Sequence, residues 1–278
     1  MKAKNLIILL AVFITYSCAK QNPCLSWQEV SGKVKSIRTT CYKAIEKFGE
    51  ISEGDVLYDD DINNLIEFDK DGNITEHSNF NHRGDLVKKF IFVFDDNGKV
   101  IKINIYDGNG DETGRIVYTY NTDNKITKTI EYDKSGKIIY TQKDEWEGDK
   151  CVKSQLINEY SEGEYWIYEY NGKSSYKSVL YDKDGKEIGI YSEYENDKLI
   201  KYVTSEYTTS ITYNEKGLCV SIVNGQHLST GSFSFLKNES YIYEYEYDTK
   251  GNWIRKIEKK KQSYKPENII IREIEYYE

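Results

Sequence analysis

The chain has 278 residues, with 46 acidic and 38 basic side chains and a formal net charge of −8. This acidic balance excludes the broad basic surface that nucleic-acid binding requires. Aromatic residues make up 14% of the chain, including 26 tyrosines, which is too many for a disordered protein. Two prolines and 19 glycines indicate many tight turns. The length of the chain is enough for one large all-β domain or two smaller domains.

Residues 1–17 predict a lipoprotein signal peptide. Lys2 and Lys4 form a short positive region, and the apolar run over residues 6–15 is too short to span a bilayer. Thr, Tyr and Ser at positions 15–17 then lead to Cys18. This arrangement resembles the lipobox of bacterial lipoproteins, although Thr stands where Leu is usual. An ordinary signal peptide with a chance cysteine is the alternative.

The lipobox resemblance implies that diacylglycerol is linked to the Cys18 sulfur and that cleavage occurs before this residue. Several acyl chains then hold the protein to the membrane. Residues 18–32 become a lipidated N-terminus and tether, and residues 33–278 a single β-repeat domain. Surface-exposed lipoproteins of Bacteroidetes resemble one another in an acidic stretch after this cysteine. Residues 19–23 contain no Asp or Glu, which favours the periplasmic side of the outer membrane over the cell surface.

From about residue 65 to residue 258, an aromatic residue followed by a polar turn recurs along the chain. The aromatic residues are Phe68, Phe80, Phe94, Tyr106, Tyr120, Tyr132, Trp146, Tyr181, Tyr213 and Tyr247. The first seven are spaced alternately by 12 and 14 residues, so every second one recurs after 26 residues. An up-and-down meander produces this double period, because its turns alternate between the two edges of the sheet. The residues between turns are rich in Ile, Val, Tyr, Thr and Phe, which is typical of strands.

The turn chemistry predicts a β-hairpin at each repeat. Asp or Asn begins the turn and caps it with its own side chain, and Gly follows three residues later. This pattern suits a type I turn with Gly in the left-handed bulge position, where φ is positive. We therefore predict an all-β fold: an antiparallel up-and-down meander of repeated β-hairpins. The long sheet should twist and curl into a half-barrel or an incomplete shell, because long flat open sheets are unusual.

The same turn geometry predicts the register of the hairpins. Phe68 should oppose Ile74, Phe94 should oppose Val100, and Tyr132 should oppose Ile138. In the last hairpin, Tyr247 should oppose Trp253, Glu246 should oppose Ile254, and Glu244 should oppose Lys256. One face of this hairpin would then carry Tyr243, Tyr245, Tyr247, Trp253, Arg255 and Ile257.

The turn-centred repeat resembles the YD (Rhs-type) repeats, in which an aromatic residue is followed by Asp, two variable residues, Gly and then Lys, Arg or Asn. The segments YDKSGK, YDKDGK, YDTKGN and FDKDGN match this pattern best. The chain also looks like uncharacterised lipoproteins of Bacteroidetes. Rhs proteins use the repeats as a β shell around a toxin. This chain has no toxin domain and few repeats, so that function does not transfer.

Catalytic and metal-binding patterns are weak. His77, His82 and His227 belong to no ligand set of known spacing, and no nucleophile elbow or Ser-His-Asp order is present. Alternating oxygen ligands over residues 107–111 resemble the start of a calcium loop, but turn capping explains them without calcium. The cysteines after Cys18 form no CxxC pair. We therefore predict no enzyme activity, no metal and no cofactor.

The tyrosines allow two interpretations. In the first they are structural, because each ring covers its neighbours while its hydroxyl reaches water. In the second, aromatic rows bind a glycan, with Trp253, Tyr243, Tyr245, Tyr247 and Trp166 as the candidate binding residues. The favoured function is a non-enzymatic binding or scaffold module for a protein or other ligand. A glycan-binding lipoprotein is the second hypothesis, and a hydrolase with its site in residues 195–246 is the third.

Overall fold

The computed structural model describes residues 30–57, 63–161, 163–226 and 240–278. Within these ranges the chain forms nineteen antiparallel strands in one sheet, which confirms the predicted all-β meander. The described part contains no helix of the length and apolarity that a membrane span requires. The strands up to β10 are β1 Val34–Lys47, β2 Glu50–Val56, β3 Asn64–Phe68, β4 Ile74–Phe80, β5 Leu86–Phe94, β6 Val100–Asp107, β7 Glu112–Tyr120, β8 Ile126–Asp133, β9 Ile138–Glu147 and β10 Lys150–Asn158. Those that follow are β11 Tyr165–Tyr170, β12 Tyr176–Tyr181, β13 Glu187–Glu195, β14 Lys198–Val203, β15 Tyr207–Tyr213, β16 Cys219–Gln226, β17 Tyr241–Tyr247, β18 Trp253–Lys260 and β19 Pro266–Tyr276.

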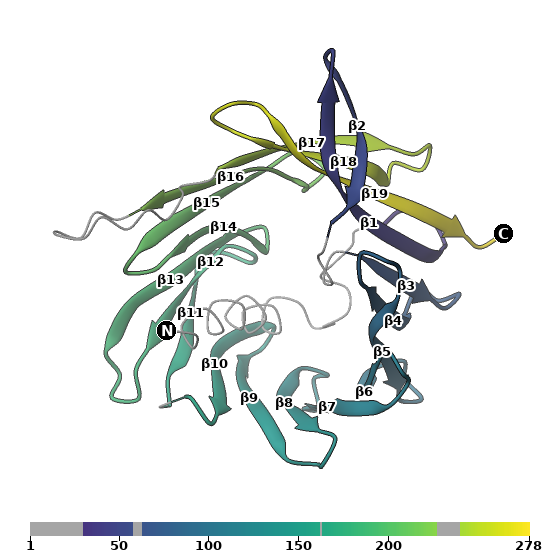
Figure 1. Cartoon of the computed structure of the whole chain (residues 1–278). Coiled ribbons are helices and arrows are strands. Elements are labelled where there is room, and N and C mark those ends of the chain that lie inside the picture. Colours follow the sequence, from purple (N-terminus) through teal and green to yellow (C-terminus); the bar gives the residue numbers. More distant parts are fainter. Residues whose placement is uncertain (1–29, 58–62, 162, 227–239) are drawn as a thin grey trace.

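The sheet closes on itself because β1 pairs with both ends of the meander. β1 pairs with β19 along most of its length, and its first half also pairs with β3 on the other side. Its second half pairs with β2. Among the described strands, β1 and β3 to β19 thus form a ring of eighteen, from which the β1–β2 hairpin extends (Figure 1). The predicted curl is correct, but it continues to closure and does not stop at a half-barrel or an incomplete shell.

The turns have the predicted chemistry. In the last hairpin, the backbone N–H of Asp248 donates to the carbonyl of Asn252 (2.9 Å), and the N–H of Gly251 donates to the carbonyl of Asp248 (3.1 Å). The Asp248 carboxylate accepts hydrogen bonds from the N–H groups of Lys250 and Asn252, both at 2.9 Å. Gly251 has a φ of 86°, in the left-handed region that glycine adopts without strain. Local capping of this kind explains why each repeat forms a hairpin.

A β-bulge next to the turn corrects the predicted register of the last hairpin. Tyr247 opposes Trp253 as predicted, but Glu246 opposes Arg255, not Ile254. Ile254 is an extra residue in the outgoing strand, so every later pair is displaced by one position. Glu244 accordingly does not oppose Lys256, which instead lies opposite Tyr245.

The same bulge recurs at successive hairpins and accounts for the curvature. The predicted pairs Phe68–Ile74, Phe94–Val100 and Tyr132–Ile138 are all present, and each is followed by a register shift. A bulge bends its strand and increases the local twist. Because the shift is repeated from hairpin to hairpin, the bends accumulate, and the meander can return to β1.

One face of the sheet can be followed around the ring, because directly paired residues point to the same side. In β3 to β7, for example, one row consists of Ile66, His77, Phe90, Ile105 and Gly114. This face also carries both clusters of buried apolar side chains. Side chains converge on the concave side of a closed sheet and diverge on the convex side. The face with the clusters is therefore the inner face.

The 26-residue period separates the aromatic residues by face. The series that begins at Phe68 lies on the inner face, and the series that begins at Phe80 lies on the outer face. The first series is Phe68, Phe94, Tyr120 and Trp146, and the second is Phe80, Tyr106 and Tyr132. Outer rings are covered by cations, as Phe80 is by Arg38 (5.0 Å) and Tyr132 by Arg115 (4.8 Å). Turns on opposite edges of the ring thus direct their aromatic residues to opposite faces.

The outer face carries charged side chains in the middle of its strands. The cations among them are Lys89, Lys102, Arg115, Lys128, Lys153, Lys177 and Lys201. Several form ion pairs with glutamates on the neighbouring strand, for example Lys89 with Glu76 (2.8 Å). A barrel that spans a membrane needs an uncharged, apolar outer band. In the described strands, the outer face carries these charged side chains at mid-strand.

Gly114 provides a test of how closely the strands approach one another. It is buried in β7, and a Cβ atom added there would lie 2.5 Å from the carbonyl oxygen of Tyr132 in β8. Because that oxygen belongs to the backbone ladder, Gly114→Ala should destabilise the protein by about 1–3 kcal/mol. Urea unfolding measures this change. Gly225→Ala in β16 is the matched control, since its added Cβ would lie 3.9 Å from the carbonyl oxygen of Thr208. Equal stability of the two variants would contradict the expectation.

Candidate functional site

Four of the five predicted binding residues lie together on the inner face. Tyr243, Tyr245 and Tyr247 alternate along β17, and Trp253 begins β18 opposite Tyr247. The ring centroids of Tyr245 and Trp253 are 5.9 Å apart in an edge-to-face arrangement, and those of Tyr245 and Tyr247 are 6.4 Å apart. The Tyr245 hydroxyl donates a hydrogen bond to the carbonyl oxygen of Cys219 (2.6 Å), which fixes the ring. The four residues therefore form one aromatic wall on the inside of the ring.

Two cations join this wall, and the predicted register did not place either there. The bulge at Ile254 turns Lys256 to the inner face, with its Nζ atom 5.2 Å from the Tyr243 ring centroid and 5.7 Å from that of Trp253. The guanidinium carbon of Arg272, in β19, lies 3.3 Å from the centroid of the Trp253 ring. A rule that adds one bulged residue after each aromatic pair would have moved Lys256 to this face from sequence alone. No local sequence pattern would have placed Arg272 beside Trp253.

The environment of these cations is poor in water. Loss of hydration on burial lowers the pKa of Arg272 to about 9. The same cause lowers the pKa of Lys256, while Glu258 opposes this effect and Arg272 adds to it. Burial also raises the pKa values of Tyr243 and Tyr245, so their hydroxyls stay protonated. The site therefore places Lys256 and Arg272 beside protonated phenol groups in an environment that disfavours charge.

The inner cations differ from the outer ones in their partners. On the outer face of the same hairpin, Arg255 pairs with Glu246 (2.6 Å) and Lys259 with Glu244 (2.7 Å). Lys256 and Arg272 form no ion pair within the described ranges. In the same part of the chain, the Nε atom of Arg272 is buried without a hydrogen-bond partner. Buried donors in folded proteins are usually satisfied, so this atom is an exception among the described side chains.

A polar row borders the two cations. Glu258 and Asn268 oppose each other in β18 and β19, and Glu258 also opposes Tyr243. The Asn268 amide donates to the Glu258 carboxylate (2.7 Å). This row supplies hydrogen-bond donors and acceptors next to the aromatic rings and the positive charges.

The fifth predicted residue, Trp166, lies elsewhere on the inner face. It belongs to β11, six strands before β17 in the ring, and its side chain is 3% exposed. Its cluster contains Tyr168, Tyr176 and Tyr194, and the last two rings stack with their centroids 4.4 Å apart. The structure thus does not bring Trp166 to the other four residues. Its burial favours a role in packing.

A polar network lies beside the Trp166 cluster. The Ser154 hydroxyl donates to the buried Asp144 carboxylate (2.6 Å), and the Gln142 amide donates to the same carboxylate (2.9 Å). Ser154 is directly opposite Trp166 in the ladder. These bonds satisfy a buried carboxylate, and the Ser154–Asp144 bond joins β10 to β9.

The remaining candidate residues are dispersed. His77 stacks on Phe90 on the inner face, at 5.6 Å between ring centroids, whereas His82 is in an exposed turn. Among the residues that the structure describes, no three His, Cys, Asp or Glu side chains are grouped to hold a metal ion. Cys18, the signal peptide and His227 lie outside the described residues, as does most of the predicted tether.

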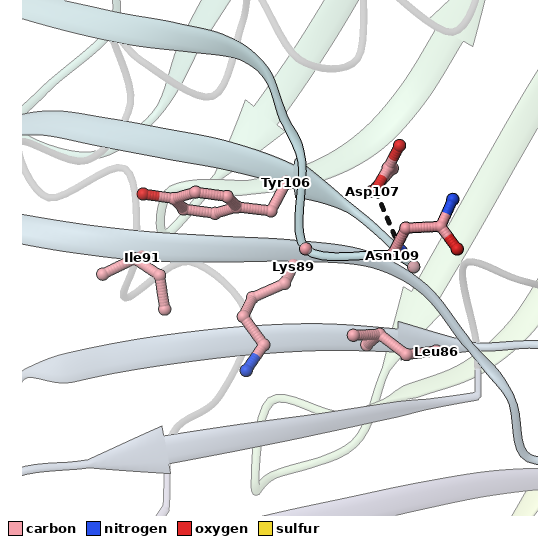
Figure 2. Close-up of a pocket in the computed structure, with 8 residues that line it drawn as sticks. Leu86, Lys89, Ile91, Tyr106, Asp107 and Asn109 are labelled. Carbon is pink, nitrogen blue, oxygen red and sulfur yellow. Dashed lines mark hydrogen bonds between the residues drawn. The ribbon is translucent and has the colours of Figure 1, made fainter.

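The possible calcium loop over residues 107–111 is a capped turn. The Asp107 carboxylate accepts hydrogen bonds from the N–H groups of Asn109 (2.9 Å) and Asp111 (3.1 Å). Figure 2 shows this turn beside a recess on the outer face, lined also by Lys89 and Tyr106. Asp107 thus has the same capping role as Asp248 in the last turn, and capping alone accounts for its position.

Comparisons with known proteins add only distant similarities in structure. No protein-family model matches the chain, and no curated protein matches it. A porin-like protein from Bacteroides uniformis aligns over 88% of this chain and 99% of its own, with 11% identity and a TM-score of 0.46. A chain in the TcdB2-TccC3-Cdc42 structure aligns over 85% of this chain and 14% of its own, with 10% identity and a TM-score of 0.30. Both scores are below 0.5, so neither similarity bears on function.

Proposed function

We propose that this protein is a lipid-anchored β-barrel of the bacterial cell envelope that acts as a non-enzymatic binding module. The observation that carries the proposal is the distribution of polarity between its two faces. Lysines, arginines and glutamates alternate along the outer face, whereas tyrosines and tryptophans line much of the inner face, together with Lys256, Arg272 and the buried carboxylate of Asp144. Such a barrel can stay in water and hold a ligand inside. Barrels of 16–18 strands enclose a wide centre.

Two features support an envelope location. The lipobox-like sequence before Cys18 predicts anchoring by acyl chains rather than by the strands. The absence of acidic residues at positions 19–23 favours the periplasmic side of the outer membrane. A relationship to YD-repeat lipoproteins remains part of the proposal, supported by the turn chemistry of the hairpins.

Cys18→Ala tests the lipid anchor. Wild-type protein should sediment with outer membranes and resist extraction at alkaline pH, whereas the variant should move to the soluble periplasmic fraction. The reason is that the charged outer face cannot replace the lost acyl chains. Cys219→Ala is the matched control, because Cys219 is a free cysteine in the described part of the chain, and this variant should stay with the membranes. A Cys18→Ala protein that still resists alkaline extraction would overturn the proposed anchor.

Glycan binding is the second candidate function, because the inner wall combines aromatic rings with polar groups around Trp253. A scaffold for another protein would need an accessible surface, and the closed ring leaves its outer face and the β1–β2 hairpin for this purpose. A hydrolase with its site in residues 195–246 stays a hypothesis without a described site, because His227 lies outside the described ranges.

A further inference from the structure

We propose that Lys256, Arg272 and Trp253 form the binding site for an acidic saccharide, a sugar that carries a carboxylate. This inference rests on the proposed binding function and specifies its ligand. The three side chains come from β18 and β19, and they meet on the inner face around the Trp253 ring.

Charge supports an anionic ligand. Lys256 and Arg272 repel each other, and no carboxylate forms an ion pair with either of them in the described part of the chain. Their neighbours on the outer face, Arg255 and Lys259, each have a glutamate within 2.7 Å. Two adjacent, partly desolvated cations destabilise the folded protein, and Glu258 offsets only part of this cost because it acts on Lys256 without forming an ion pair with it. An anion bound between them would remove this repulsion.

The geometry of Arg272 supports a carboxylate as the bound group. Its guanidinium lies against the Trp253 ring, so its plane is restricted, and it forms no ion pair with a carboxylate of the described residues. A guanidinium offers paired N–H donors that match the two oxygens of a carboxylate. The nearby Lys256 ammonium adds a second charge without demanding a fixed direction.

The surroundings support a saccharide as the body of the ligand. The rings of Tyr243, Tyr245 and Trp253 provide flat apolar surface, and such surface with a few placed polar groups is typical of small-molecule sites. Glu258 and Asn268 lie in the adjoining row and can accept and donate hydrogen bonds to hydroxyl groups. A ligand with a charged group next to a hydroxyl-bearing ring can contact the aromatic rings, the two cations and the polar row.

Isothermal titration calorimetry of the full mature chain with trigalacturonate tests the proposal. Wild-type protein should bind this probe, with an affinity that falls as salt concentration rises. Arg272→Gln and Lys256→Gln should each weaken binding at least tenfold, and Arg272→Lys should weaken it less than Arg272→Gln. Lys259→Gln, which removes a cation of the outer face, should bind as the wild type does. Thermal unfolding of each variant shows whether it is folded, and Trp253→Leu provides a further variant if Arg272→Gln is not.

Neutral trigalactose and inorganic phosphate are the comparison probes. Weak or absent binding of both would support a site that needs the charge and the sugar together. Trigalactose that binds as tightly as trigalacturonate would overturn the role of the two cations, and phosphate bound in place of trigalacturonate would overturn the saccharide. No binding of trigalacturonate would overturn the inference and leave the envelope proposal standing. The envelope proposal is tested separately, by the membrane fractionation of the Cys18→Ala variant.

Discussion

Trp166→Ala should lower the free energy of unfolding by about 3–5 kcal/mol, the range for removing a buried Trp side chain. Trp166 is 3% exposed and is surrounded by the buried side chains of Cys151, Tyr168, Tyr176, Leu180 and Tyr194. Alanine would leave a cavity among aromatic rings, and these can collapse only in part because strand pairing holds their backbones. Urea unfolding followed by circular dichroism measures the change as a lower midpoint with a similar slope.

Tyr160→Ala is the matched control for this prediction. The Tyr160 side chain is 66% exposed in the turn after β10, so its removal should change the stability by less than about 0.5 kcal/mol. If Trp166→Ala unfolded at the same urea concentration as Tyr160→Ala, the aromatic cluster would not contribute to stability. The tryptophan would then have to be reconsidered as part of a binding surface.

The stability of the protein should depend on the protonation of His77. Desolvation lowers the pKa of His77 in the folded protein from 6.5 to about 4, so the unfolded chain binds the proton more tightly. Between these pH values stability therefore rises with pH, and it is complete above about pH 6.5. A pKa unit corresponds to about 1.4 kcal/mol, so the loss on going down to pH 4 is at most about 3 kcal/mol. Because part of the His77 imidazole ring is exposed to water, the loss of stability is smaller than this upper limit.

His77→Phe should remove this dependence, because phenylalanine can keep the stacking on Phe90 without taking up a proton. The measurement is the difference in unfolding free energy between pH 7 and pH 4 for wild type and variant. Turn carboxylates also titrate in this range, but they do so equally in both proteins. His82→Gln in an exposed turn is the control, and its pH profile should follow that of the wild type. Identical profiles for His77→Phe and wild type would contradict the prediction.

The hairpins could be predicted from sequence because their determinants are local. The Asp248 side chain caps residues two and four positions further on, and Gly251 supplies the one positive φ that the turn requires. The pair Tyr247–Trp253 follows directly from this turn. The bulge one pair later was missed, because nothing in the turn chemistry of a single hairpin demands an extra residue.

That omission affected the predicted site. With Ile254 bulged, Lys256 instead of Arg255 shares the tyrosine face, and the glutamates pair with Arg255 and Lys259 on the other side. Arg272 reaches Trp253 only because β19 pairs with β18 in a particular register. The aromatic half of the candidate site was therefore predictable, whereas its cations depended on strand registers that local patterns do not specify.

By itself, the sequence determined the repeated hairpins, the antiparallel meander and the 26-residue period of the aromatic residues that precede the turns. Each depends on contacts between residues close in the chain. Only the tertiary structure decided that the sheet closes, because closure requires β1 to pair with β19, as Ile37 does with Ile274. Pairing between the two ends of a meander depends on the curvature accumulated over all its bulges. No single segment of the chain carries that information.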